Sequence, residues 1–221
     1  TYMSQALEIS LLGELRVRAM GQEIVLPASK KARALLAFLV ATGRPHRRER
    51  LCELFWDLPD DPKAALRWAL SKLRRAVDTP DRLRIIADRE RVQFDAEGIG
   101  IDILDIHARL RNQAGLLGVT ELEDMATRLG NMLLDGLDGA GDEAFDAWLT
   151  AEREDVHLAQ VEVYRRLATH RDIGPAASRK WQRLWLEADP EGAEAHQRMR
   201  SDTSPAGLQR VTSTSGLSSD H

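Results

Sequence analysis

The sequence predicts a mainly α protein with a small antiparallel β component, built as two domains. Residues 7–26 and 83–94 contain short stretches of β-type patterning, whereas most of the remainder repeats apolar residues at helical spacing. A length of 221 residues is sufficient for two small cores. Residues 1–94 hold 18 Lys and Arg against 12 Asp and Glu, and residues 95–221 hold 13 against 23, so a basic half precedes an acidic half.

The composition excludes several classes of protein. No apolar run approaches the roughly 18 residues of a membrane span, and no signal-peptide pattern is present, so we expect a cytoplasmic protein that does not enter a membrane. The single cysteine, Cys52, allows no internal disulfide and is predicted to be a small packed residue. The overall net charge of −4 argues against a nucleic-acid partner, but the net charge of +6 in residues 1–94 favours one.

The sequence shows no constellation of catalytic or metal-binding residues. The histidines are scattered without cysteine partners, and Asp135, Asp138 and Asp142 do not match the spacing of a calcium loop. Neither a phosphate-binding glycine motif nor a strained serine elbow is present. We therefore expect no metal, no cofactor, no catalytic residue and no enzyme activity.

The N-terminal domain begins with three predicted strands. Partial alternation of apolar residues marks Leu7–Leu12, Leu15–Ala19 and Glu23–Leu26. Gly13 and the pair Met20-Gly21 separate these segments, which favours a three-stranded antiparallel meander.

Two predicted helices follow the strands. Ser29 is suited to the N-cap of a helix over Lys30–Thr42, and Gly43 is the expected stop signal. A second helix is predicted for Arg47–Phe55, and residues 56–60 form a short loop after it.

The third predicted helix, Asp61–Val77, has two different faces. Asp61 is suited to the N-cap, and a proline in the first turn is tolerated there. One face gathers the apolar residues Leu66, Ala69, Leu70, Leu73 and Val77. The other face and its flanks gather cations, a hydroxyl and an aromatic ring: Arg67, Trp68, Ser71, Lys72, Arg74 and Arg75. This pattern suits a helix that enters the major groove of DNA, and the alternative is an ordinary surface helix with a solvated basic face.

A predicted hairpin completes the N-terminal domain. Two β-type runs, Leu83–Ala87 and Val92–Phe94, flank the polar connection Asp88–Arg91. Strands, three helices and then a hairpin make a winged helix-turn-helix, in which the third helix reads DNA and the hairpin is the wing.

From residue 101 onward the pattern is helical. The expected helices are Asp102–Gln113, Thr120–Leu134, Glu143–His170, Ala176–Glu187 and Glu191–Arg200. The order predicts a winged helix-turn-helix domain over residues 6–100, an all-α domain of paired helices over 101–200, and a disordered tail over 201–221, because the tail has little to bury.

A series of short motifs along the chain matches a known protein family. They are Leu11–Gly13, Lys30–Ala37, Arg48–Asp57, Ala65–Arg75, Leu133–Leu137, Phe145–Arg153 and Glu187–His196. In this order they resemble the Streptomyces antibiotic regulatory protein (SARP) family, in which an OmpR/PhoB-type winged helix precedes a TPR-like bacterial transcriptional activation domain. The resemblance covers residues 7–200.

The sequence departs from the family in two places. The family's wing usually carries glycines and a tyrosine, whereas Arg89–Phe94 has neither. The family's activation domain usually continues with another helix pair after the position of His196, whereas a Ser- and Thr-containing tail follows here, so this domain is either a short or a shortened version.

The resemblance implies a function and a set of contact residues. It implies a transcriptional activator that binds tandem repeats in double-stranded promoter DNA as a homodimer and recruits RNA polymerase holoenzyme. The expected DNA contacts are Arg67, Trp68, Ser71, Lys72, Arg74 and Arg75 in the third helix and Arg89 and Arg91 in the wing. The family's polymerase-contacting loop places Asp57, Asp60 and Asp61 as candidates, although these acids can also simply cap a helix, and Trp56 beside them is expected in the core.

A second class of function is also compatible with the sequence. In this alternative, the helical half is a protein-interaction scaffold and the winged helix does not read DNA, as the glycine-poor wing and the acidic net charge suggest. Arg47 and Arg48, near the start of the second helix, are candidates to hold phosphate, and the more common alternative is plain surface charge.

Overall fold

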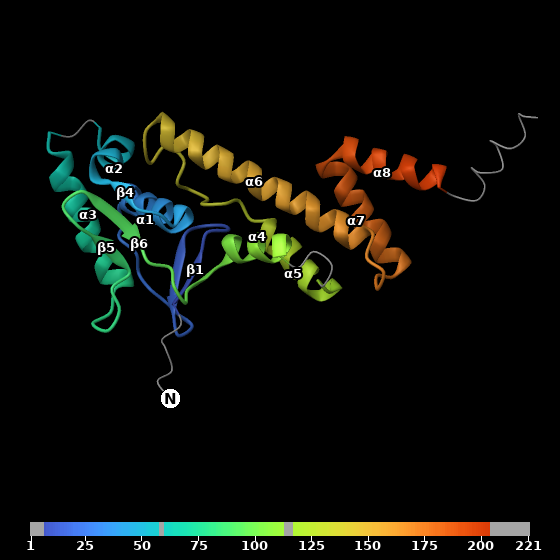
Figure 1. The fold of residues 1–221 in the computed structure, drawn as a ribbon, viewed down its shortest axis with the longest axis horizontal. Helices are drawn as coiled ribbons and strands as arrows, with labels where there is room; N and C mark the ends of the chain where they lie inside the picture. Colours follow the sequence, from blue (N-terminus) through green and yellow to red (C-terminus); the bar gives the residue numbers. More distant parts are fainter. Residues whose placement is uncertain (1–6, 58–59, 113–116, 204–221) are drawn as a thin grey trace, which may run out of the picture. The chain divides into compact units, whose positions relative to one another are not determined.

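The computed structural model describes residues 7–57, 60–112 and 117–203, and Figure 1 shows the order of the elements. Contacts divide the chain into two compact units, residues 1–116 with 127–159, and residues 117–126 with 160–221. The first unit thus includes residues beyond the predicted domain boundary at residue 100, and that boundary stays a prediction.

The first sheet is the predicted meander with one added strand. Strands β1 (Leu7–Ser10), β2 (Arg16–Ala19) and β3 (Gln22–Glu23) pair in antiparallel order, as predicted. A two-residue strand, β7 (Gly100–Ile101), then pairs with β1 in parallel. Asp102 holds this junction, because its carboxylate accepts hydrogen bonds from the backbone of Leu11 and Leu12 at 2.9 and 3.0 Å.

Three helices form the centre of the first unit. Helix α1 (Lys30–Thr42) begins at Ser29, whose side chain accepts from the Ala32 amide, and ends at Gly43 with a φ of 61°. Helices α2 (Arg48–Phe55) and α3 (Pro62–Val77) follow within one residue of their predicted bounds. The helix-turn-helix prediction is confirmed.

The wing is a three-stranded sheet in the order β4-β6-β5. Strands β5 (Ile85–Ala87) and β6 (Arg91–Phe94) are the predicted hairpin, and β4 (His46–Arg47) adds to β6 from between α1 and α2. The buried His46 fixes β4, since its ring lies 4.7 Å from the Phe38 ring and its Nε2 lies 2.7 Å from Thr42 Oγ1. Because the Thr42 hydroxyl donates to the Phe38 carbonyl, His46 Nε2 carries the proton in this pair.

The winged helix shares its core with residues that follow it in the chain. Helix α4 (Asp102–Asn112) leads to α5 (Val119–Leu129), and α6 (Glu143–Ala168) follows. At the start of α6, Phe145 lies 5.1 Å from the Phe55 ring and Trp148 lies 5.0 Å from the Phe38 ring. This aromatic cluster joins α1, α2 and α6 in one hydrophobic core.

The loop between α5 and α6 corrects one predicted bound. We predicted a helix over Thr120–Leu134, but α5 ends at Leu129. Leu134 instead donates its amide to the Leu11 carbonyl at 2.8 Å and has a φ of 51°, so bonding to the end of β1 competes with the helix. Arg153 fixes the loop, because its guanidinium donates to the Leu133 carbonyl at 2.9 Å and pairs with Asp138.

The second unit contains the C-terminal helices. Helices α7 (Pro175–Ala188) and α8 (Pro190–Asp202) pack on each other, and Asp189 caps α8 through the Gly192 amide. Trp181 and Trp185 are buried in this unit, and Trp181 stacks on Tyr164 at 5.8 Å. Helix α8 includes Ser201 and Asp202 of the predicted tail, and residues 204–221 lie outside the described part. No described helix is both long enough and apolar enough to cross a bilayer.

Candidate nucleic-acid interface

Helix α3 presents one apolar and one polar face, as its sequence predicts. Leu66, Leu70 and Leu73 are buried among the other helices. On the opposite side, Arg75 and Ser71 are exposed and Trp68 keeps 51% of its surface in solvent. Exposed tryptophan is uncommon in a monomeric protein, because its large apolar ring gains most from burial. The face is therefore suited to contact with a partner.

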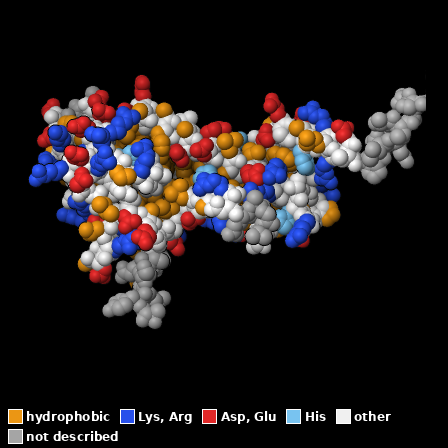
Figure 2. All heavy atoms as spheres, in the orientation of Figure 1, with side chains coloured by type: hydrophobic (Ala, Val, Ile, Leu, Met, Phe, Trp, Pro, Cys, Tyr) orange, Lys and Arg blue, Asp and Glu red, His pale blue; other side chains and the backbone are white. Residues whose placement is uncertain are grey.

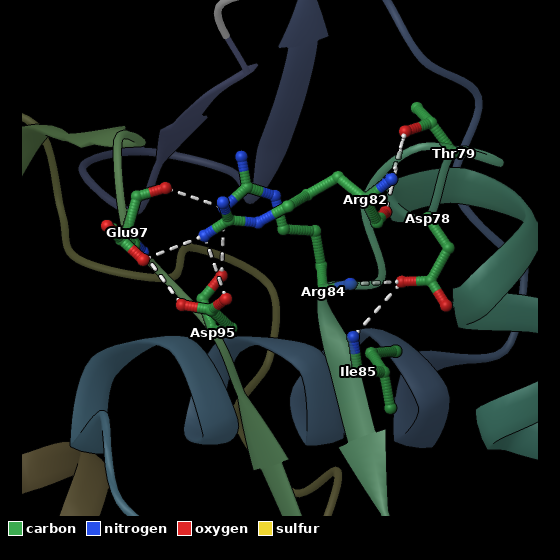
Figure 3. Close-up of polar contacts among 7 residues, drawn as sticks. All are labelled: Asp78, Thr79, Arg82, Arg84, Ile85, Asp95 and Glu97. Atoms are coloured by element: carbon green, nitrogen blue, oxygen red, sulfur yellow. Dashed lines mark hydrogen bonds and ion pairs between the residues drawn. The ribbon is translucent and has the colours of Figure 1, made fainter.

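Two acids fix the ends of α3. Asp61 is the N-cap, and its carboxylate accepts from the Ala64 amide at 2.9 Å. At the other end, the Asp78 carboxylate accepts from the amides of Arg84 and Ile85 at 2.7 and 3.0 Å, which ties the end of α3 to β5 (Figure 3). The wing is thus held at a fixed position relative to the helix.

The base of the wing uses two arginines as internal struts. Arg84 is only 7% exposed and donates to the Glu97 and Asp95 carbonyls at 2.6 and 3.3 Å. Arg82 pairs with both carboxylates of the same two residues (Figure 3). Hydrogen bonds to Glu97 and Asp95 raise the pKa of Arg82, whereas burial lowers the pKa of Arg84. These guanidinium groups are occupied inside the protein.

The turn of the wing is ordered by Asp88. Its carboxylate accepts from the amides of Glu90 and Arg91, both at 2.7 Å, and these bonds lower the pKa of Asp88. Arg48, at the start of α2, donates its Nε to the Asp88 carbonyl at 2.7 Å and its amide to the Glu90 carbonyl at 2.8 Å. The wing turn is therefore fastened to α2, and the side chain of Arg89 stays exposed at its tip.

A groove lies between α2, one flank of α3 and the wing turn. Its volume is about 860 Å³, and the cations that line it are Arg47, Arg48, Lys63, Arg67, Arg74 and Arg89. The acids in its lining are Glu49, Asp88 and Glu90. Figure 2 shows Lys and Arg side chains, in blue, with some Asp and Glu side chains, in red, over the region where Figure 1 places α2, α3, β5 and β6. The groove has an excess of positive charge.

Several cations on α3 and the wing turn form no ion pair in the part of the chain that the structure describes. Within the described residues, no ion pair involves Arg67, Arg74, Arg75 or Arg89. Arg91 of β6 lies directly opposite Arg47 of β4, and two like charges in such a pair repel each other. Cations that lie close together and outnumber the neighbouring acids favour an anionic partner.

The structure divides the predicted DNA-contacting residues into two groups. Arg67 and Arg74 line the groove with Arg89, while Trp68, Ser71 and Arg75 are exposed on the rest of α3. The Nζ of Lys72 lies 5.7 Å from the centre of the Trp68 ring, so this lysine is partly held by the indole. Arg91 is exposed on the outer face of β6.

Lys63 also lines the groove, although it is not among the predicted DNA-contacting residues. It precedes Arg67 by four residues and Arg74 by eleven, so all three share one flank of α3. That helical spacing was a signal available in the sequence.

The acidic loop before α3 has mixed roles. Asp61 serves as the helix cap, while Asp57 and Asp60 are exposed; Leu58 and Pro59, between them, lie outside the described residues. Trp56 is 8% exposed and packs edge-on against Phe55 at 5.8 Å, which confirms that it belongs to the core.

The remaining candidates are structural. Cys52 is buried and unpaired by disulfide, and burial raises the pKa of its thiol. Asp138 pairs with Arg153, and Asp142 accepts from the Phe145 amide at the start of α6. No cluster of three or more metal-ligating side chains occurs in residues 7–57, 60–112 and 117–203.

Comparisons with known proteins show the fold. No model of a known protein family matches the sequence, and no curated protein matches it. Among solved structures, the chain is similar to EmbR of Mycobacterium tuberculosis, which was determined in complex with a low-affinity phosphopeptide. The TM-score is 0.53 at 18% identity, over 92% of this chain and 73% of the EmbR chain. The predicted fold is confirmed, namely a mainly helical chain with a small β component and a winged helix followed by helices.

Proposed function

We propose that this protein is a sequence-specific regulator of transcription that binds double-stranded promoter DNA. The observation that carries the proposal is the set of cations on α3 and the wing turn that have no acidic partner within the described residues. An anionic polymer supplies the missing charge, and its grooves accept an α-helix. The likeness in fold to EmbR, together with the SARP resemblance of the motifs, supports a regulatory rather than an enzymatic role.

The geometry suggests a distinct role for each group of residues. The outward residues of α3, Trp68, Ser71 and Arg75, enter the major groove, where a guanidinium group can bond to guanine and an indole can contact a thymine methyl. Arg67, Arg74 and Arg89 line the groove beside α3 and bind the phosphates of one strand. Lys72 contributes a further positive charge next to Trp68.

We further propose that the protein is an activator that binds direct repeats as a homodimer and recruits RNA polymerase. The exposed carboxylates of Asp57 and Asp60 stand in the loop between α2 and α3, and Asp61 ends that loop. Asp57 and Asp60 make no ion pair with another described residue, so they are accessible to a basic partner. The choice of polymerase as that partner rests on the resemblance to the SARP family, in which the corresponding loop contacts RNA polymerase.

The proposal is tested with the full chain, because Phe38 and Phe55 of the winged helix pack against Phe145 and Trp148. Binding sites are first selected from a random pool of DNA, and affinity for the selected site is measured by fluorescence anisotropy at two salt concentrations. We expect the double variant Lys72→Ala, Arg75→Ala to abolish the specific complex.

Helix α7 offers a matched control. Lys180 and Arg183 have the same spacing as Lys72 and Arg75, and Lys180 lies 4.7 Å from the Trp181 ring centre. The double variant Lys180→Ala, Arg183→Ala therefore removes the same charge and the same kind of cation–π contact, and should keep wild-type affinity. Equal losses in the two double variants, or full binding by the α3 variant, would refute the assignment of α3.

The second candidate function is a protein-interaction scaffold, favoured by the net charge of −10 in residues 95–221. The same titration separates the two functions. Failure to bind any selected DNA at low salt, by a chain that is folded, favours the scaffold.

A further inference from the structure

A polar pocket lies within the second unit, remote in sequence from α3. Its volume is about 390 Å³, and one face of α8 lines it at helical spacing, with Ala193, His196, Gln197, Arg200 and Ser201. Helix α7 contributes Gln182 and Trp185, and Thr169 follows the end of α6. The lining contains no acid, although the surrounding half of the chain is acidic.

Two nitrogens of the lining residues are buried without a partner. Trp185 is only 4% exposed, and neither its Nε1 nor the Nε2 of His196 has a hydrogen-bond partner within the described residues. The two rings lie 5.2 Å apart. An indole nitrogen can only donate, and the great majority of buried polar atoms in proteins have a hydrogen-bond partner. Within the described residues this pair therefore lacks the acceptor that a ligand in the pocket would supply.

The other polar groups of the lining indicate that the acceptor is negatively charged. The hydroxyls of Thr169 and Ser201 already donate to the carbonyls of Arg165 and Gln197. Arg200 makes no ion pair with another described residue and is the one charged residue of the lining. Arg200 and Trp185 line the same pocket, and a guanidinium group and an indole N–H both form charge-assisted bonds with an oxyanion.

We propose that this pocket binds a small oxyanion, the carboxylate or phosphate group of a low-molecular-weight ligand. Arg200 supplies the positive charge, Trp185 donates its indole N–H, and His196 donates from Nε2 when that atom carries the ring proton. A ligand at this place gives the helical half of the chain a binding activity of its own, independent of DNA.

The test follows the indole N–H signals of the full chain by ¹H–¹⁵N NMR. Inorganic phosphate and succinate are titrated separately at constant ionic strength, with sodium chloride as the reference anion. The Trp185 signal is identified by its absence in the Trp185→Phe variant. We expect it to shift saturably with phosphate, with succinate or with both, and the tighter of the two identifies the preferred head group.

The Trp68 signal serves as an internal control, because phosphate that binds to α3 shifts that signal and leaves Trp185 unchanged. The outcome at Trp185 is therefore separate from the outcome of the DNA-binding proposal. Absence of a saturable shift at Trp185 with either anion, or a shift that chloride reproduces, overturns the pocket.

A matched pair of variants on α8 tests the role of Arg200. Arg200→Gln should weaken the binding of the anion about tenfold, which is typical of one lost charge-assisted bond. Arg198→Gln removes the same charge from an exposed position two residues away that does not line the pocket, and should leave binding unchanged. Equal weakening by the two variants would show non-specific attraction and contradict a built site.

Discussion

Arginines at the base of the wing and arginines on α3 do opposite things with the same side chain. Arg82 and Arg84 are bound to Asp95 and Glu97, through carboxylates and carbonyls, and hold the wing together. Arg67 and Arg74 line an open groove without an acid partner in the described structure. A guanidinium group that is satisfied internally contributes to stability, whereas one that is not is available to a ligand. Local pairing therefore separates the arginines that hold the wing together from those that are available to a ligand.

Removal of the buried strut should give the largest effect on stability. Arg84→Ala leaves the Asp95 and Glu97 carbonyls without their donor, and we expect the free energy of unfolding to fall by on the order of 4 kcal/mol. Urea denaturation measures this change. Arg75→Ala, on the exposed face of α3, is the control and should change stability by less than about 0.5 kcal/mol. Similar losses in both variants would contradict the division.

The internally satisfied group also includes His46, which predicts a dependence on pH. Burial, and then the charge of Arg44, lower its pKa to about 4. The unfolded chain binds the proton near pH 6.5 and the folded chain does not, so stability is full above about pH 6.5 and is lost as the pH falls toward 4. We expect His46 to account for a loss on the order of 3 kcal/mol over that range.

Urea denaturation of the wild type and of His46→Gln, repeated between pH 7 and 4, isolates this contribution. Because glutamine does not titrate, the free energy of unfolding of the variant should fall less steeply with decreasing pH. Parallel curves for the two proteins would show that His46 is not the group responsible.

The arginines without an ion pair, Arg67 and Arg74, should contribute to the salt dependence of DNA binding. Arg67→Gln with Arg74→Gln should lower the slope of log K against log salt by about 2, since each lost phosphate contact removes about 0.9. Affinity at moderate salt should fall roughly tenfold or more without loss of stability. Arg82→Gln is the control, because Arg82 is already ion-paired inside the protein, and its slope should match that of the wild type. An equal change in slope would contradict the division between paired and unpaired arginines.

Substitution of the three acids before α3 should give the smallest effects. Asp61→Ala should cost about 1 kcal/mol of stability, because the cap of α3 is lost. Asp57→Ala and Asp60→Ala should be neutral for stability and for DNA affinity, yet lower transcription from a reconstituted promoter. If neither of these two variants changes transcription, the loop does not contact polymerase.

Much of the fold and of the α3 surface was predictable from the sequence. Ser29, Gly43 and Asp61 signal helix ends through local chemistry, and the apolar stripe of α3 fixes which residues face outward. These signals are local, since they depend on neighbours within one or two turns. For that reason α1, α2 and α3 lie within one residue of their predicted bounds, and the face of α3 with Trp68, Ser71 and Arg75 is exposed as predicted.

Tertiary structure alone decided the long-range pairings. Strands β4 and β7 have two residues each, too few for any periodic pattern, and exist because His46 and Ile101 find partners far along the chain. Helix α5 ends before its predicted C-terminus for the same reason, because the Leu134 amide donates to the Leu11 carbonyl. Whether an arginine is a strut or a free cation also depends on which acid folds back beside it. Sequence patterns therefore predicted which face of α3 is polar, and folding determined which of its cations remain available to a ligand.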